Sequence, residues 1–169
     1  MSYRVLLILP TLYRRWASAR LYDLQDWIVS WANEYMYAGV PSMGAADGWY
    51  QTAVQLEYYF VTGEPFAGGA VDIMKCFDQI RRGLLYALAE RIGMPKRILR
   101  AYKNYHESVA AYNCIAGALG QPYKKPSSIP QGCPLSMAFM ALLMLPWTRM
   151  VETMNAIPRV LADDILLIV

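Results

Sequence analysis

The chain has 169 residues, of which 56% are hydrophobic and 17% are charged, and its formal net charge is +3. This length suits one domain with a hydrophobic core rather than two, and the composition excludes a disordered chain, which needs low hydrophobicity and high charge. The small positive charge permits a polyanionic partner without requiring one. The longest apolar stretch, Met137 to Trp147, is too short to cross a bilayer and contains Pro146, so the sequence predicts no membrane-spanning helix.

The first half of the chain combines helical patterns with one candidate strand that carries a carboxylate. Apolar residues at a spacing near 3.6 predict helices, and Asp47 and Asp78 are expected to cap the starts of two of them. Asp72 lies in the candidate strand. The predicted elements are an extended segment over 3–10, helices over 13–37 and 48–61, a strand in the second half of 66–74, and a helix over 78–91.

The second half begins with a helix that Pro95 opens and ends in an apolar strand. Its predicted elements are a helix over 95–108, a hairpin strand over 109–118, a loop over 120–128, a turn over 129–134, an apolar helix over 135–150, and two strands that flank Asp163 and Asp164. Helices and strands do not alternate regularly along the chain. The expected fold class is therefore α+β, an antiparallel sheet backed by helices.

The adjacent carboxylates Asp163 and Asp164 precede an apolar strand, where a lone Asp would be costly to bury. This stretch alone leaves two interpretations open, a turn between strands or a metal site. Asp72 could lie beside Asp163 if their strands are neighbours in the sheet. Two magnesium ions would then offset the repulsion between the carboxylates and form a clamp for in-line phosphoryl transfer.

Three motifs occur in order: VDIMKCFD over 71–78, IPQGCPLS over 129–136 and LADD over 161–164. Together they resemble the reverse transcriptase family, most closely the enzymes of non-LTR retrotransposons and group II introns. The segment 3–14 is also similar to the fingers segment that precedes these motifs in the family. The resemblance implies a polymerase palm with a ferredoxin-like core. It also implies an RNA-directed DNA polymerase that uses an RNA template, a DNA or RNA primer, a dNTP and two Mg²⁺ ions, with Mn²⁺ as a substitute.

The resemblance implies roles for individual residues. Asp72 and Asp163 would be the principal metal ligands, and Asp164 would be a further metal ligand or support and would complete the catalytic set. Phe77 matches the aromatic residue that crowds a ribose 2′-hydroxyl and so favours deoxynucleotides. The implied nucleotide-binding residues are Arg4, Lys75, Phe77, Gln131 and Gly132. Glycine allows close backbone approach, and glutamine can hydrogen-bond a sugar or base.

The resemblance implies that residues 1–169 form a single incomplete reverse transcriptase domain, which ends just after the double-Asp hairpin and has no thumb. Residues 1–66 would be fingers-like and 67–169 the palm core, with part of 96–128 a candidate for the fingers. The chain departs from the family at Val5, where proline is usual, and at Leu161, where an aromatic residue is usual. Two alternatives stay open: a catalytically inactive retroelement remnant that at most binds nucleic acid, and an RNA-templated RNA polymerase. Localisation is open, although a retroelement product would act in the nucleus or in a ribonucleoprotein.

Several residues outside these motifs also carry expectations. His106 is expected to be solvated, and Cys76 and Cys133 are expected to be buried structural thiols. The basic residues of the helix over 95–108 are expected to form a solvated face, with contact to a nucleic-acid backbone as the alternative: Lys96, Arg97, Arg100 and Lys103. Four tryptophans are expected to lie in the core: Trp16, Trp27, Trp31 and Trp49.

Overall fold

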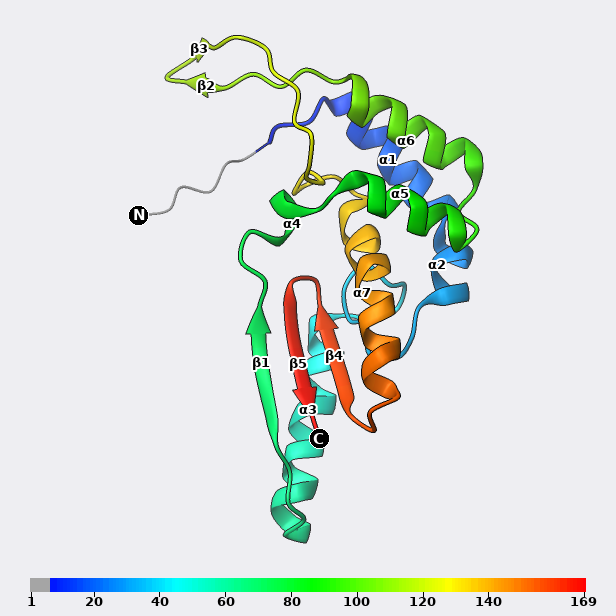
Figure 1. Ribbon diagram of the computed structural model, residues 1–169, viewed down its shortest axis with the longest axis vertical. Helices are drawn as coiled ribbons and strands as arrows, with labels where there is room; N and C mark the ends of the chain where they lie inside the picture. The colour runs from blue at the N-terminus through cyan, green and yellow to red at the C-terminus, as the bar shows by residue number, and fades with distance from the viewer. Residues whose placement is uncertain (1–6) are drawn as a thin grey trace.

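The computed structural model describes residues 7–169, in which a small sheet lies beside a cluster of helices (Figure 1). Its class is mixed α+β, as the sequence predicts. The antiparallel sheet has the strand order β1-β5-β4 and consists of β1 (Gly68–Asp72), β4 (Ile157–Leu161) and β5 (Asp164–Ile168). The helices are α1 (Thr11–Asp23), α2 (Gln25–Trp31), α3 (Ala45–Thr62), α4 (Cys76–Gln79), α5 (Arg82–Arg91), α6 (Lys96–Ser108) and α7 (Ser136–Glu152). A separate two-stranded pair joins β2 (Cys114–Ile115) to β3 (Ala118–Leu119).

The β4–β5 hairpin is closed by a two-residue turn at Ala162 and Asp163, with Leu161 and Asp164 paired at its end. Ala162 has a φ of 59°, and a positive φ at the first central residue is typical of the tight turns that join twisted antiparallel strands. The outer edge of β4 is extended by a parallel bridge between Met36 and Val160. Because β5 is the central strand, β1 lies along the side of the hairpin and brings its C-terminal end to the turn (Figure 1).

Helix α7 is the centre of the core. It packs against β4 on one side and against α5 on another, and its sequence is apolar around most of its circumference. Phe139 of α7 meets Tyr102 of α6 edge to face, with ring centroids 4.7 Å apart. Such burial of aromatic and aliphatic surface supplies most of the stabilisation of a fold of this size. No helix in the range 7–169 is long and apolar enough to cross a membrane.

Helix α3 differs from the others because none of its side chains is buried. Asp47 does not precede the helix but lies in its first turn, where its Oδ2 accepts a hydrogen bond from the Gly44 backbone N at 2.8 Å. Trp49 is 74% exposed, which corrects its predicted place in the core. The periodic pattern correctly predicts the helix α3, but its apolar residues, Trp49 among them, are not buried against other elements.

Two predicted helices are divided in the structure. The expected helix over 13–37 is α1 followed by α2, which ends at Trp31. Asp78 lies inside the short helix α4 rather than capping a long one, and Ile80 is extended with φ −61° and ψ 120°. The Ile80 carbonyl accepts a hydrogen bond from Ser128 N at 2.8 Å. This long-range contact replaces the helical bonds that the local pattern predicts.

Candidate metal and nucleotide site

The candidate site lies where β1 meets the β4–β5 turn. Asp72, the last residue of β1, is the direct cross-strand partner of Asp164, the first residue of β5. Ile73 N donates a hydrogen bond to the backbone carbonyl of Asp163 at 3.2 Å, which extends this pairing into the turn. The strands that carry the predicted carboxylates are therefore sheet neighbours, and the register sets Asp72 opposite Asp164 with Asp163 adjacent in the turn.

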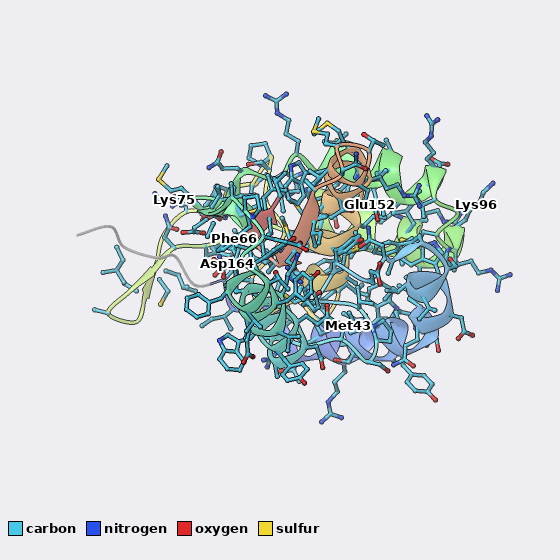
Figure 2. All side chains as sticks on the ribbon, turned by 90° about the horizontal axis from the view of Figure 1, so that it is seen from below. Met43, Phe66, Lys75, Lys96, Glu152 and Asp164 are labelled. Atoms are coloured by element: carbon cyan, nitrogen blue, oxygen red, sulfur yellow. The ribbon has the colours of Figure 1, made fainter. Side chains whose placement is uncertain are left out.

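Asp72 acts electrostatically on the Cys76 thiol and also lines a cavity. Burial raises the pKa of the Cys76 thiol, and the negative charges of Asp163 and Asp72 raise it further. Asp72 and Asp164 also line a cavity between α3 and the sheet. Viewed along the strands, Asp164 lies beside α3, whereas Lys75 lies farther out toward the edge of the molecule (Figure 2).

The carboxylates of Asp72, Asp163 and Asp164 offer the oxygen ligands that Mg²⁺ prefers, but the three side chains do not form one metal-holding group. No ion pair in the described part of the chain involves them, and Asp72 and Asp164 are exposed. Residues 7–169 contain no group of three or more His, Cys, Asp or Glu side chains that could hold a metal ion. Mg²⁺ is commonly bound by one or two carboxylates, waters and substrate phosphates. Asp72 and Asp163 could therefore supply the protein ligands, with water or substrate supplying the others.

The motif over 129–136 is joined to the motif over 71–78 by backbone hydrogen bonds. Ile129 N donates to the Phe77 carbonyl at 3.0 Å. On the far side of the turn, Ser136 Oγ donates to the Pro130 carbonyl at 2.6 Å, which holds the start of α7 against the loop. Gly132 has a φ of 91°, a conformation that glycine adopts without strain. The structure thus places the second motif directly beside the end of the first.

The predicted nucleotide-binding residues lie in different settings. Lys75 is exposed and has a φ of 52° immediately before α4, and Gln131 is half-buried beside the exposed Gly132. Phe77 belongs to the hydrophobic core with 8% of its surface exposed, so only a small part of its ring could meet a ligand. Arg4 and the start of the fingers-like segment lie outside the described residues.

Arg82 is a positioning residue that the sequence prediction missed. Its guanidinium donates hydrogen bonds to the carbonyls of Lys125, Ser127 and Ser128, at 2.6, 3.2 and 3.4 Å, and to Glu107 Oε1 at 3.0 Å. These bonds fix the loop that leads into the 129–136 motif. The signal available in the sequence was the spacing of Arg82, Leu85 and Ala89, which places the three residues on one face of a helix. The structure buries all three side chains on that face of α5.

His106 is buried, which corrects the expectation of a solvated side chain. Its Nε2 lies 2.8 Å from the Tyr13 hydroxyl, which in turn lies 3.2 Å from Cys133 Sγ. Burial lowers the pKa of His106 to about 4, and the Arg82 charge acts in the same direction. Burial also raises the pKa of Tyr13 and of Cys133, so at neutral pH all three groups are uncharged and can form one hydrogen-bonded chain. Cys76 is also buried, so the predicted burial of both thiols is confirmed.

The exposed α6 residues Lys96, Arg97, Arg100 and Lys103 match the predicted basic face.

Comparison with known proteins identifies no relative: no protein-family model matches the chain, and no curated protein sequence matches it. The chemistry of the site therefore has to be inferred from its own residues.

Proposed function

We propose that this chain is the palm of an RNA-directed DNA polymerase, which transfers a deoxynucleotide to a primer 3′-hydroxyl on an RNA template. The pairing of Asp72 with Asp164 across β1 and β5, with Asp163 next to it in the turn, is the observation that carries the proposal. Independent support comes from the hydrogen bond between Ile129 N and the Phe77 carbonyl, which brings the Gln131-Gly132 turn to the same end of the sheet.

In this proposal, Asp72 and Asp163 hold the divalent ions and Asp164 supports them. Two Mg²⁺ ions at this place would supply positive charge that stabilises the attacking and leaving oxygens during in-line phosphoryl transfer. Because carboxylates hold the ions but transfer no proton in this scheme, the protein contributes mainly by positioning and electrostatic stabilisation. The close pairing of like charges is then a functional requirement of the site.

The nucleotide would be oriented by residues around the carboxylates. Gly132 allows the backbone to approach the nucleotide, and Gln131 can donate to or accept from a sugar or base. Lys75 is assigned a contact with the primer or a phosphate, and Arg4 is assigned a contact with the incoming triphosphate. Phe77 is assigned the discrimination against a 2′-hydroxyl, as the resemblance implies.

One observation favours the alternative of a protein that binds nucleic acid without catalysis. The exposed basic face of α6 forms no ion pair with a carboxylate in the described residues. A row of exposed cations can bind a phosphate backbone without any metal. The two functions therefore differ in whether ligand binding depends on divalent ions.

The test is a titration of the chain with Mn²⁺, followed by electron paramagnetic resonance, and then with fluorescent dTTP or UTP. Asp72→Asn and Asp163→Asn should each weaken Mn²⁺ binding by about tenfold or more, and metal-dependent dTTP binding should be lost with it. Asp26→Asn, on the exposed side of α2, is the matched control and should bind like the unchanged chain.

The outcomes separate the candidates. Unchanged Mn²⁺ binding in Asp72→Asn would refute the carboxylate site. Binding of an RNA–DNA hybrid in EDTA, with no metal-dependent dTTP binding, would support the non-catalytic alternative. Equal metal-dependent binding of UTP and dTTP would favour an RNA-templated RNA polymerase.

A further inference from the structure

The cavity between α3 and the sheet is large enough for a small organic molecule. Its volume is about 530 Å³, which falls within the usual size range of small-molecule sites. Its wall is mainly apolar and includes Trp49 of α3, Val71 of β1, and Ile165 and Leu166 of β5. Arg159 of β4 is the one cationic side chain in this wall.

Arg159 is buried without a compensating negative charge. Its side chain is 8% exposed, and its Nη2 donates to Gln55 Oε1 at 2.7 Å and to the Gln51 carbonyl at 3.4 Å. Its Nε and Nη1 atoms are buried and have no hydrogen-bond partner in the described part of the chain. A guanidinium stays charged at any physiological pH, and a buried charge with unsatisfied donors is costly. An anionic group in the cavity would offset that cost.

The neighbouring polar groups hold Arg159 but do not neutralise it. Gln51 and Gln55 lie one turn apart on α3, and Tyr37 donates its hydroxyl hydrogen to Gln51 Oε1 at 2.6 Å. Burial raises the pKa of Tyr37, so the phenol remains neutral. The arrangement is a preorganised cation within an uncharged polar frame, a common feature of anion-binding pockets.

The carboxylates of the candidate metal site lie farther along the hairpin. Arg159 pairs with Leu166 across β4 and β5, whereas Asp164 pairs with Leu161, two residues nearer to the turn. Asp164 and Asp72 form no ion pair with Arg159 within the described residues. An anion bound to Arg159 would therefore be separate from the proposed metal ions, although both lie along one cavity.

We propose that this cavity binds an organic anion, with a carboxylate or phosphate group on Arg159 and an apolar or aromatic body against Trp49, Val71 and Leu166. The site goes beyond the proposed polymerase function, because it requires neither divalent ions nor a nucleic acid. Charge-assisted hydrogen bonds from Arg159 would fix the orientation, and the apolar wall would supply burial of the ring.

The test is calorimetry on the whole chain in EDTA at fixed ionic strength, with three probes: 1-naphthyl phosphate, 1-naphthoate and the neutral 1-naphthalenemethanol. Both anions should bind more tightly than the alcohol, and the ratio of their affinities distinguishes a phosphate site from a carboxylate site. Arg159→Gln should weaken anion binding by about tenfold or more, since hydrogen bonds to a charged group are lost. Arg149→Gln, an exposed change on α7, is the matched control and should have no effect.

A second variant decides the matter if Arg159→Gln does not fold. Ala70→Leu keeps the arginine but places a larger side chain in the cavity wall, and loss of anion binding there would support the site. Binding that persists in a folded Arg159→Gln or Ala70→Leu variant, equal binding of the alcohol, or no binding of either anion would overturn the proposal. Loss of binding in Asp163→Asn would also overturn it, because the anion would then depend on the carboxylates. Since EDTA removes divalent ions, failure of the polymerase proposal leaves this result unchanged.

Discussion

Asp72 and Asp164 face each other as direct partners in the antiparallel pairing of β1 with β5. Like charges at such positions destabilise a sheet, by about 0.2–1 kcal/mol for a cross-strand pair. Asp163 adds a third carboxylate in the adjoining turn. A sheet with this arrangement gains stability when a cation binds, so conformational stability and metal binding should be linked at this end of the hairpin.

Asp72→Asn is therefore expected to stabilise the metal-free chain while removing its response to metal. In EDTA, the melting temperature should rise by about 1–3 °C, because one of two opposed charges is removed. Millimolar Mg²⁺ should raise the melting temperature of the unchanged chain but not that of the variant. Differential scanning fluorimetry measures both effects. Asp23→Asn is the control, because Asp23 pairs with Arg20 at 2.9 Å and its loss should give no increase. A lower melting temperature for metal-free Asp72→Asn would contradict this account.

Gly39→Ala is expected to destabilise the chain more than Gly63→Ala, although both glycines have a similar positive φ. A Cβ at Gly39 would lie 2.2 Å from the backbone carbon of Met137, so the 35–40 segment would have to move away from the start of α7. Gly39 also has a φ of 74°, which costs about 1–2 kcal/mol for an L-residue. We expect a total loss of about 2–4 kcal/mol in urea unfolding.

The matched control is Gly63→Ala at the end of α3. Gly63 has a φ of 71°, but a Cβ there would meet nothing within 4 Å. The control should lose only the backbone term of about 1–2 kcal/mol. Equal losses in the two variants would show that the close approach between Gly39 and Met137 does not contribute.

The stability of the chain is expected to fall in mild acid because of His106. Its pKa is lowered from 6.5 to about 4 by burial, so the unfolded chain takes up the proton more readily than the folded one. The contribution of neutral His106 is complete above pH 6.5 and is lost as the pH falls toward 4. Integrated over that range, the loss is about 3 kcal/mol. Urea midpoints measured at half-unit pH steps test this dependence.

The control for this prediction is His106→Gln, which cannot titrate. It should be less stable at pH 7, because the hydrogen bond to Tyr13 and the packing of the ring change, but its stability should fall less between pH 6.5 and 4. If the two pH profiles are parallel over that interval, His106 is not responsible for the acid sensitivity.

The sequence predicts well where local patterns determine structure. The apolar helix over 135–150 corresponds to α7, and the strands around Asp163 and Asp164 correspond to β4 and β5. Helix α7 and strand β5 each contain an unambiguous apolar run, whereas β4 is interrupted by Pro158 and Arg159. The sequence alone places β1 beside the hairpin only on the assumption that the two carboxylate-bearing strands are neighbours, and the structure shows β1 paired with β5. The polymerase resemblance and the assigned roles of Asp72, Asp163 and the nucleotide-binding residues stay predictions.

The errors arise where distant contacts override local patterns. His106 looks solvated beside Glu107, but its partners Tyr13 and Cys133 come from α1 and from the turn before α7, and Tyr13 is 93 residues away in the sequence. Trp49 fits the apolar stripe of α3, yet that stripe is not covered by other described residues. A single sequence gives the period of a helix but not the surface that packs against it.

The loop before the Pro130-Gln131-Gly132 turn is expected to depend on Arg82. Arg82→Met keeps much of the side-chain volume but leaves three loop carbonyls without their charged donor, including that of Lys125 at 2.6 Å. Hydrogen bonds to a charged group contribute about 1.5–3 kcal/mol, so stability should fall by a similar amount. Arg81→Met, at the exposed neighbouring position, should change stability by less than about 0.5 kcal/mol.

Hydrogen exchange separates a local effect of Arg82 on the loop from general destabilisation of the fold. In Arg82→Met, amide protection should fall first over 125–132 and only later in α7. Uniform loss of protection would show that Arg82 supports the whole fold rather than this loop. If the loop is loosened, metal-dependent dTTP binding should weaken while Mn²⁺ binding alone is retained, because the carboxylates lie on the sheet and Gln131 follows the loop.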